Sequence, residues 1–558
     1  MWRINDTWIF WKRGDRGAPK NSGERIYSSI PARWRVITKI FFLINNGTFI
    51  ERDKGRRNQS RRGVKRQRQQ LCRSILKDCL LICGPKYGVI FFVTENMKKL
   101  LLPILILFLF QACDKNDPSP TTSDSGNEHV NNWIYDNMSY WYYWKDDMPA
   151  NPDKSQDPEA FFNSLKSSSD RFSWIQENYG DLLNTLRGVN KEAGFEFALY
   201  RASESNNNVI MQVLYVKPNS PASSAGINRG DVVDQINSTQ ITTDNYQALL
   251  KAMSSDHTLT YRPLNLETQA FGEDKTISIT PVEYAEDPNY LNKVFTYNDH
   301  KIGYYVYNLF SAGPDDQSKT YETEMDNIFA DFKSQGITDL VLDLRFNSGG
   351  AETEAQNLAS LIAPNVTSTT VFVSHQYNDK VTADIKADPS LGEGFLSIPF
   401  LVKSQNIGSQ LRDNRVYILT GSRTASASEL IINGLKPFMD VYLVGDTTIG
   451  KNVGSISIYD KDDPNNTWGM QPIVVKLLNK NGESNYEKGF VPQQLDPDNH
   501  LVLYPLGDPN ESLLSKAINQ ITGGVPARVA ERPKAGELLF HSLDAKKRSG
   551  IVTVDLPF

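Results

Sequence analysis

The sequence has few of the residues that build disulfide frameworks or metal centres. Its 558 residues include four cysteines, at positions 72, 79, 83 and 113, and six histidines. Because no cysteine lies beyond Cys113, the predicted folded body holds no disulfide and no thiolate site. Cys79 and Cys83 have neither a second cysteine pair nor a histidine cluster to complete a site. We therefore expect no metal ion and no cofactor.

Three further absences each argue against a class of function. The sequence has no glycine-rich phosphate loop of the GxxxxGK[ST] type, which argues against a P-loop nucleotide enzyme. Its net charge of −5 does not suggest nucleic-acid binding by the whole chain, although residues 51–70 are strongly basic. The apolar run from Leu100 to Phe110 is shorter than the ~20 residues that a comfortable transmembrane helix needs.

The composition is otherwise that of a globular protein. Hydrophobic residues make up 39% of the sequence and charged residues 22%, and both fractions are ordinary for a folded chain. A chain of 558 residues is too long for one hydrophobic core. We therefore expect two to four domains.

An export signal is predicted inside the chain, at residues 97–113. Lys98 and Lys99 precede the apolar run, and Gln111-Ala112-Cys113 follows it, as in a signal peptide. The segment resembles a bacterial lipoprotein signal. That resemblance implies that Cys113 is lipidated and that the protein is an exported lipoprotein of the cell envelope, facing the periplasm or in the outer membrane. A plain secretory signal or a membrane anchor is the alternative.

The segments on either side of this signal are predicted to be unstructured. Since a signal peptide should begin a protein, we interpret residues 1–96 as a disordered upstream extension that comes from a misplaced start codon. A genuine basic arm that binds nucleic acid or anionic lipid is the alternative. Residues 114–127 are polar and rich in proline and serine, which suits a flexible tether between membrane and domain.

A serine and a lysine stand out near residue 430. The apolar run 416–419 predicts a buried strand, the small residues 424–428 a tight turn, and Leu430-Ile431-Ile432 the start of a helix. Such a turn exposes a serine hydroxyl beside a backbone N–H. Lys451 follows after a second apolar strand, 441–445. Because a neutral lysine can activate a serine, this layout predicts a Ser/Lys hydrolase.

Four features in the same order resemble the C-terminal processing (tail-specific) peptidases of family S41. The first is Thr424-Ala425-Ser426-Ala427-Ser428-Glu429 with a lysine 25 positions after Ser426. The second is the strand-like run at residues 339–350, which ends in Arg345-Phe346-Asn347-Ser348-Gly349-Gly350. The third is Gly489-Phe490-Val491-Pro492, and the fourth is a PDZ-like module upstream. Together they cover roughly residues 130–505.

The resemblance implies a multidomain α/β protein. A small N-terminal helical domain is expected at residues 128–187, a β-rich PDZ-like domain at 188–283 and a crotonase-like α/β serine peptidase domain at 295–505. Residues 365–412 are expected to be an irregular insertion, with a β-rich lid as the alternative. In the C-terminal tail, 506–558, residues 512–521 are consistent with a helix, and no chemistry is visible between residues 530 and 550.

The PDZ-like module carries a candidate peptide-binding loop. Gly194-Phe195-Glu196-Phe197 resembles the carboxylate-binding loop of such domains, residues 209–216 alternate as a strand, and 246–253 are expected to form the helix of the groove. In that mode an extended peptide adds to a sheet edge, and backbone N–H groups hold its terminal carboxylate. Phe195 and Phe197 would favour an apolar last side chain. A β domain used only for packing is the alternative.

The family motif implies specific catalytic roles. It marks Ser426 as the nucleophile, whereas the strand–turn–helix pattern alone does not choose between Ser426 and Ser428. Lys451 is the expected general base, provided that burial lowers its pKa from ~10.4. The oxyanion hole would combine the N–H of Ala427 with one from Gly349 or Gly350, and the sequence does not choose between the glycines.

Support roles are predicted for residues around this dyad: Arg345, Asn347, Glu429 and Ser455. Ser455 stands where many family members have a glutamine that orients the lysine, so Ser455, Asn452 or another residue would take that role. The six histidines form no recognisable Ser/His/Asp pattern. A Ser/His triad stays open as an alternative, with His375 the histidine to examine.

These features predict a lipid-anchored serine endopeptidase that cleaves C-terminal segments of proteins. Its partners would be protein or peptide substrates with accessible C-termini and the membrane, and not nucleic acid. The rival interpretation is a non-catalytic, PDZ-bearing lipoprotein that binds peptides on a degenerate peptidase scaffold. Hydrolysis of a non-peptide acyl group by the same dyad is a third possibility. The oligomeric state stays open.

Overall fold

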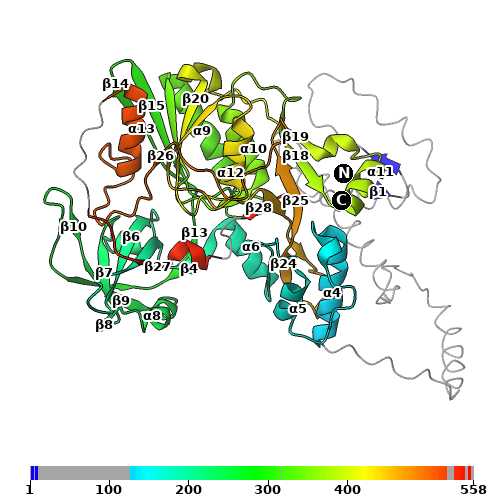
Figure 1. Ribbon diagram of the computed structural model, residues 1–558, viewed down its shortest axis with the longest axis horizontal. Coiled ribbons are helices and arrows are strands. Elements are labelled where there is room, and N and C mark those ends of the chain that lie inside the picture. Colours follow the sequence, from blue (N-terminus) through cyan, green and yellow to red (C-terminus); the bar gives the residue numbers. More distant parts are fainter. Residues whose placement is uncertain are drawn as a thin grey trace, which may run out of the picture. The chain divides into compact units, whose positions relative to one another are not determined.

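The computed structural model describes residues 2–4, 7–9, 126–315, 317–524, 533–546 and 551–554. The chain divides into two compact units, residues 1–121 and 122–558. In the first unit, strands β1 (Trp2–Ile4) and β2 (Thr7–Ile9) pair antiparallel. The predicted signal, with Cys113, and most of the predicted tether lie outside the described residues. All elements discussed below belong to the second unit (Figure 1).

The second unit begins with a small, mostly helical region. Its elements are α4 (Gly126–Trp141), the 3-10 helix η3 (Lys145–Asp147), α5 (Pro158–Leu165), β3 (Trp174–Gln176) and α6 (Tyr179–Arg187). Asp157 caps α5 by accepting the N–H groups of residues 159 and 160, and Pro158 occupies the first helical position. Buried aromatic residues, among them Tyr142, Phe161 and Phe162, form the core.

This helical region is joined to the rest of the second unit by backbone pairing. Strand β3 pairs antiparallel with β24 (Gly469–Gln471), which in turn pairs with β23 (Ile458–Tyr459). Asn378 adds two hydrogen bonds, to the carbonyls of Tyr140 and Tyr142. The aromatic cluster of residues 140–144 therefore packs between two regions.

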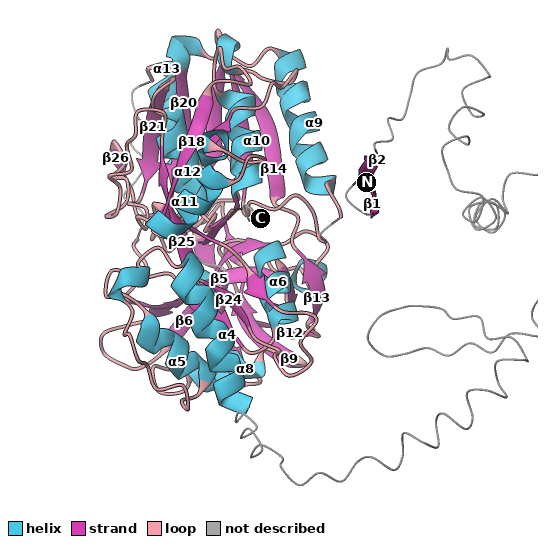
Figure 2. Cartoon of the chain, turned by 90° about the vertical axis from the view of Figure 1, so that its right-hand side faces the viewer, coloured by secondary structure: helices cyan, strands magenta, loops and turns pink. Residues whose placement is uncertain are grey.

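The next region is a β-rich domain (Figure 2). Its strand order is β12-β9-β7-β6-β5-β27. Its strands are β5 (Phe195–Arg201), β6 (Val209–Val216), β7 (Val232–Ile236), β8 (Thr239–Gln240), β9 (His257–Arg262), β12 (Lys275–Ile279) and β27 (Leu538–His541). Helices α7 (Pro221–Ser224) and α8 (Tyr246–Ala252) belong to it, and the pairs β10 (Leu264–Asn265) with β11 (Ala270–Phe271) and β4 (Val189–Glu192) with β13 (Val282–Ala285) adjoin it. Strand β27 comes from the C-terminal tail.

The largest region contains a six-stranded sheet with the order β14-β15-β16-β20-β21-β26. Its strands are β14 (Asn289–Tyr297), β15 (His300–Tyr307), β16 (Asp339–Asp343), β20 (Arg415–Thr420), β21 (Asp440–Gly445) and β26 (Gln494–Leu495). All neighbours pair in parallel except β14 with β15. Helices α9 (Thr320–Gln335), α10 (Glu352–Ile362), α12 (Ala427–Leu435) and α13 (Ser512–Thr522) accompany this sheet.

The sequence periodicity accounts for this layer. Strand β16 is buried at all five residues, as expected for a parallel strand that is covered on both faces. Helix α9 buries Met325, Ile328, Phe329 and Phe332 at helical spacing. The strands predicted at 209–216, 416–419 and 441–445 are all present, and so are the helix predicted after Ser426 and the one suggested at 512–521. The predicted multidomain α/β architecture is confirmed.

A second six-stranded sheet has the order β17-β28-β22-β25-β18-β19. Its strands are β17 (Gly349–Ala351), β28 (Ile551–Thr553), β22 (Val453–Ser455), β25 (Ile473–Leu478), β18 (Val371–Tyr377) and β19 (Ser397–Pro399). Between β18 and β20 lie α11 (Asp379–Ala387) and the 3-10 helices η4 (Glu393–Leu396), η5 (Gly408–Gln410) and η6 (Arg412–Asn414). Strand β28 comes from the tail, and the short helix α14 (Ser542–Ala545) lies between β27 and β28 in sequence.

The expectation of an irregular insertion at residues 365–412 is wrong in part. The segment supplies β18, α11 and β19, and Phe372 and Val373 on β18 belong to the main hydrophobic core. From Val373 to Tyr377 buried residues alternate with more exposed ones, which is a strand pattern that the expectation of an irregular segment overlooked. The segment is therefore part of the second six-stranded sheet and of the core beneath it.

Candidate active site

Ser426 lies at a strained turn between β20 and α12. Its backbone has φ 64° and ψ −113°, and positive φ is rare for a residue with a side chain. Its Oγ is buried and has no hydrogen-bond partner among the described residues. Strain of this kind persists only where the surrounding structure holds it, and it gathers at functional sites. The turn has the geometry expected of a serine nucleophile.

The neighbouring serines are engaged elsewhere. The Oγ of Ser428 donates a hydrogen bond of 3.0 Å to the carbonyl of Asn347. Ser422 is exposed, and its Oγ accepts a hydrogen bond from the guanidinium of Arg423. The three-dimensional structure therefore distinguishes Ser426 from Ser428, which the strand–turn–helix pattern could not do.

Lys451 follows β21 and is almost completely buried, with 1% of its surface exposed. Its Nζ has no hydrogen-bond partner in the described part of the chain and lies 5.0 Å from the centre of the Phe172 ring. Burial lowers the pKa of Lys451 to about 7, although the more distant carboxylates of Asp170 and Glu429 oppose the shift. Near neutral pH a large fraction of this amine is therefore able to accept a proton.

Glu429 joins the serine turn to the lysine loop. Its Oε2 accepts the backbone N–H groups of Ser426 and Lys451, each at 2.8 Å. Its Oε1 accepts the N–H of Gly450 at 2.6 Å and the hydroxyl of Thr448 at 2.5 Å. Burial raises the pKa of Glu429, and these four hydrogen bonds act in the opposite direction. One carboxylate thus positions the backbone of both predicted catalytic residues.

The two glycines of β17 differ in what their backbone does. The N–H of Gly349 donates to Oδ1 of Asn347 at 2.9 Å, so it is already used within the loop. Gly350 has φ 143°, and a Cβ there would lie 2.2 Å from the carbonyl oxygen of Phe310. Ala427 is the first residue of α12, where N–H groups have no partner within the helix. Gly349 is therefore engaged within its own loop, and Gly350 lies in the ladder between β17 and β28, so the choice of the companion of Ala427 in an oxyanion hole stays a prediction.

Asn347 and Arg345 brace this loop. The amide of Asn347 donates to the carbonyl of Tyr307, while its own carbonyl accepts Ser428. The buried guanidinium of Arg345 contacts Asp343 at 2.8 Å and forms two hydrogen bonds to Glu511, of 2.6 and 2.9 Å. Glu511 caps helix α13. Arg345 therefore ties the end of β16 to that helix.

The residue that would orient Lys451 is not identified by its contacts. Ser455 lies buried on β22, four residues after the lysine, and its carbonyl accepts the N–H of Val554. Asn452 donates instead to the carbonyl of Ser484 and to the carboxylate of Glu487. The assignment of this role to Ser455 stays a prediction.

The N-terminal helical region contributes to the lysine site, which the sequence analysis did not foresee. One guanidinium nitrogen of Arg171 donates to the carbonyls of Gly450, at 2.8 Å, and Glu487, at 3.1 Å. The next residue, Phe172, places its ring near Lys451. No sequence motif marks this pair, because the contact exists only once two regions of the chain have packed together.

The histidines offer no better base. His375 contacts Glu352 at 2.8 Å and the hydroxyl of Tyr377 at 3.4 Å, and no serine of the described residues is hydrogen-bonded to it. His500 lies beside Asp496 and Ser512, but both contact the same ring nitrogen, Nε2, at 3.2 and 3.3 Å. In a catalytic triad the serine and the carboxylate bind opposite nitrogens. Neither histidine is therefore arranged as a triad base.

The predicted carboxylate-binding loop precedes and begins β5. Phe195 and Phe197 are buried in the domain core, with ring centres 5.6 Å apart. Gly194 has φ 88°, and a Cβ there would meet the side chain of Ser220. The N–H of Phe197 donates to Oγ of Ser542, from α14 of the tail, at 2.9 Å. Glu196 is also buried and contacts the same hydroxyl.

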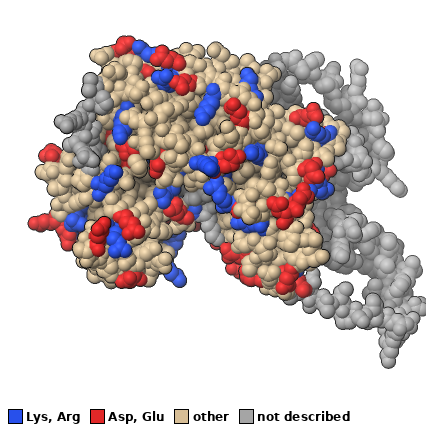
Figure 3. Space-filling model, in the orientation of Figure 1, with Lys and Arg blue, Asp and Glu red and all other residues tan. Residues whose placement is uncertain are grey.

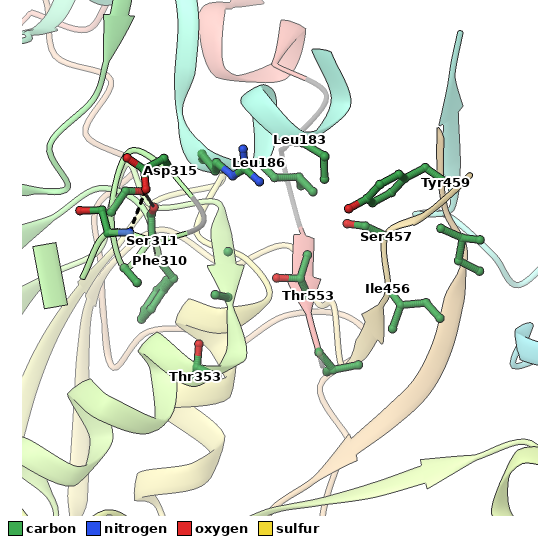
Figure 4. A pocket seen from close by; sticks show the side chains of 18 of the residues that line it. Leu183, Leu186, Phe310, Ser311, Asp315, Thr353, Ile456, Ser457, Tyr459 and Thr553 are labelled. Carbon is green, nitrogen blue, oxygen red and sulfur yellow. Dashed lines mark hydrogen bonds between the residues drawn. The ribbon is translucent and has the colours of Figure 1, made fainter. Parts of the chain in front are cut away.

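A cavity of about 880 Å³ opens beside the glycine loop, which is the segment that contains Gly349 and Gly350. Leu183 and Leu186 of α6 face it from one side, Phe310 and Thr353 lie near the glycine loop, and Thr553 of the tail stands between them (Figure 4). Ile456, Ser457 and Tyr459 complete the opposite wall. Gly350 also lines the cavity, whereas Ser426, Ala427 and Lys451 are not among its lining residues.

Other predicted features can be examined only within the described residues. They contain no group of three or more potential metal ligands. None of their helices combines the length and the apolar character that a membrane crossing requires. On the face drawn in Figure 3, basic and acidic side chains are interspersed. The lipidation predicted at Cys113 lies outside this part of the chain.

Comparison with protein families gives three matches along the chain. The profile of peptidase family S41 matches residues 301–498, and the profile of the peptidase S41 N-terminal domain matches residues 129–174. A PDZ-domain profile matches residues 212–262. The three matches follow the order of the regions described above.

Individual proteins show the same similarity. A carboxyl-terminal-processing protease of Picosynechococcus sp. is 24% identical over 317 residues, which cover 56% of this chain and 67% of that protein. A probable CtpA-like serine protease of Staphylococcus epidermidis is 25% identical over 285 residues, 50% of each chain. The chain thus spans about half to two thirds of the length of these relatives. A crystal structure of a putative S41 protease from Bacteroides fragilis aligns with a TM-score of 0.58 and 28% identity, covering 70% of this chain and 97% of that one.

Proposed function

We propose that this chain, which belongs to peptidase family S41, is a serine endopeptidase of the C-terminal processing type with Ser426 and Lys451 as its catalytic dyad. The observation that carries the proposal is the pair of buried polar atoms, Oγ of Ser426 and Nζ of Lys451, neither of which has a protein partner among the described residues. Buried polar groups are normally paired, so two unpaired groups on residues whose backbones are held by one carboxylate call for a functional explanation.

The chemistry follows from the geometry. The neutral amine of Lys451 takes the proton of Ser426 as the serine oxygen attacks the scissile carbonyl, and the resulting ammonium returns a proton to the leaving amine. The N–H groups of Ala427 and of Gly349 or Gly350 stabilise the oxyanion. In this structure Ser426 and Lys451 are not hydrogen-bonded to each other, and such contacts often tighten only when substrate binds.

The substrates are proposed to be proteins with accessible C-terminal regions. Family membership and the PDZ match support this, because the names of the relatives describe processing at the carboxyl terminus. The PDZ-like domain would hold the C-terminal region of the substrate on a sheet edge and deliver the chain to the cavity beside Gly350. The proposal includes anchoring of the exported protein through a lipid on Cys113, which Cys113→Ala and membrane fractionation would test.

The test uses an unfolded protein substrate with an apolar C-terminal tail. The parent chain should cleave it, whereas Ser426→Ala and Lys451→Ala should each lower kcat at least ~1,000-fold. Ser422→Ala is the matched control, because this exposed serine lies on the same loop, and it should retain activity. A serine-directed fluorophosphonate should label Ser426. Binding of the substrate without cleavage or labelling would favour the non-catalytic scaffold instead.

A further inference from the structure

The C-terminal segment of the chain adds the last strand, β27, to the PDZ-like sheet, next to β5. Strand β27 pairs antiparallel with β5, with Leu538 opposite Tyr200, Phe540 opposite Leu199 and His541 opposite Ala198. Leu539 and Phe540 pack against the core of this domain. Strand addition at a sheet edge is the way in which such domains bind peptides. The tail is therefore seated as a peptide ligand would be, on the strand that follows Gly194.

At the loop, the tail presents a hydroxyl group instead of a carboxylate. The Oγ of Ser542 accepts the N–H of Phe197 at 2.9 Å and donates to Oε2 of Glu196 at 2.5 Å. A hydroxyl can do both, whereas an ionised carboxylate only accepts. A terminal carboxylate in this position would face the carboxylate of Glu196 with no proton to offer. The chemistry of the loop thus favours a serine or threonine within a chain.

The charges around this loop favour a basic side chain as well. Lys546 of the tail contacts Glu196 and lies 3.1 Å from Glu192. Lys217 contacts Glu192, Glu196 at 3.1 Å and Glu286 at 2.8 Å. Three carboxylates therefore share two ammonium groups. Removing Lys546 would leave one ammonium for three largely buried carboxylates, which is costly unless another cation replaces it.

The same tail continues into the catalytic region. Strand β28 pairs in parallel with β17, so that Gly349 lies opposite Ile551 and Gly350 opposite Val552. The N–H of Val554 donates to the carbonyl of Ser455 at 3.0 Å. The tail thus contacts first the sheet edge of the PDZ-like domain and then the strand that holds the predicted oxyanion hole. This order is the one expected of a substrate chain.

We propose that the edge of β5 is a binding site for an internal, extended peptide segment that carries a serine or threonine and, four residues later, a lysine or arginine. Residues 538–546 of this chain are its resident ligand, and a substrate must displace them. The inference rests on the peptide recognition proposed above and names its chemistry, but it does not depend on catalysis.

The test measures peptide binding in the Ser426→Ala chain, in which no probe is consumed. The probe is a fluorescent, amidated peptide with the sequence of residues 535–546, followed by fluorescence anisotropy. Lys546→Glu should release the tail, raise hydrogen exchange at residues 538–541 and tighten probe binding at least tenfold. Lys534→Glu is the matched control, because it makes the same charge change at an exposed position of the same tail. It should leave both the hydrogen exchange at residues 538–541 and the affinity for the probe unchanged.

Two peptide comparisons define the ligand class. Replacing the lysine of the probe by glutamate should weaken binding at least tenfold. A shorter probe that ends at the residue equivalent to Ser542 should bind more weakly as a free acid than as an amide. Tighter binding of the free acid would overturn the proposal, because it would show a conventional carboxylate loop. Failure of Lys546→Glu to change exchange in a folded chain would overturn the role of the tail.

A second variant guards against a folding defect in Lys546→Glu. Ser542→Ala removes only the hydroxyl and should also tighten probe binding, by a smaller factor. Unchanged binding in a folded Ser542→Ala chain would count against the proposal. If the parent chain cleaves substrates but no variant binds the probe, this inference is overturned and the proposed peptidase activity is not. A chain that binds the probe as expected but cleaves nothing overturns the proposed peptidase and leaves the ligand site standing.

Discussion

Two lysines of this protein are buried to the same extent and have opposite surroundings. Lys451 in the peptidase region and Lys217 in the PDZ-like region are each 1% exposed. The ammonium of Lys217 contacts three carboxylates, those of Glu192, Glu196 and Glu286. The nitrogen of Lys451 forms no ion pair among the described residues and faces an aromatic ring. Two equally buried lysines thus differ in whether a carboxylate is paired with the ammonium group, and only Lys451 has the surroundings that the proposed role as a base needs.

The two lysines are also expected to affect the stability of the fold in opposite directions. A paired buried lysine keeps its charge and holds its neighbours together, and losing it leaves carboxylates without a partner. An unpaired buried lysine weakens the fold, because the unfolded chain keeps the proton that the native site disfavours. The protein retains this cost at Lys451, which is what we expect of a catalytic base.

The largest expected contrast is in stability. Lys217→Met should lower the free energy of unfolding by about 3–5 kcal/mol, because it breaks a buried ion cluster from one side. Lys451→Met should raise it by up to ~5 kcal/mol, the upper limit set by a pKa shift from 10.5 to about 7 at ~1.4 kcal/mol per unit. Denaturant titrations of both variants and the parent measure the two effects.

The pH dependence fixes the sign of the second effect. Above pH ~10.5 Lys451 is neutral in both the native and the unfolded chain. Its ionisation therefore contributes nothing there to the difference in free energy of unfolding between the parent and Lys451→Met. As the pH falls from 10.5 to about 7, the unfolded chain binds a proton that the native site does not, and the advantage of the variant grows. Below about pH 7 it stays constant. An advantage that shrinks over this range would contradict a lowered pKa.

A carboxylate placed near Lys451 should convert it into a lysine like Lys217. Phe172→Glu puts an acidic group where the aromatic ring now lies, and this should raise the pKa of Lys451 by stabilising the ammonium. We expect kcat at pH 7 to fall at least ~100-fold and to recover in part toward pH 10. Phe172→Leu is the control and keeps the site apolar. A loss that persists unchanged at high pH would indicate lost packing instead.

Much of the fold and the candidate dyad could be predicted from the sequence because their signals are local. Apolar runs marked β16, β20 and β21, and the small residues between β20 and α12 marked the serine turn. The strand–turn–helix pattern alone did not choose between Ser426 and Ser428, and the resemblance to the family motif favoured Ser426. The structure adds a difference between the two serines. This difference rests on the bond from Ser428 to Asn347, a residue 81 positions earlier.

The tail shows the opposite case. Residues 530–550 are charged, and a charged segment in isolation predicts a solvated surface. The partners that give Lys546 a role, Glu192 and Glu196, lie in the PDZ-like domain, and Asp544 binds Arg423 next to the serine turn. No local periodicity reports such pairings. The same limit hid the contribution of Arg171 and Phe172 to the lysine site.

The carboxylate of Glu429 should matter less than the base itself. In Glu429→Gln the amide nitrogen would face backbone N–H groups, because all four partners of Glu429 are donors. We expect kcat to fall about 10- to 100-fold with KM nearly unchanged, together with a stability loss of about 1–3 kcal/mol. Steady-state kinetics measures the effects on kcat and on KM separately. Glu393→Gln, at an exposed carboxylate, is the control, and a change confined to KM would argue against a positioning role.

The smallest expected effect comes from the contact between regions that supports Lys451. Arg171→Ala removes the hydrogen bonds to the carbonyls of Gly450 and Glu487 but leaves Phe172 in place. Because Arg171 is exposed, water replaces part of what is lost, and kcat should fall only a few-fold, with the pH profile kept. Arg412→Ala removes a comparable surface contact, to Asp299, and should change nothing. If Arg171→Ala instead shifts the pH profile toward higher pH, the helical region sets the pKa of the base through Arg171 as well as through the Phe172 ring.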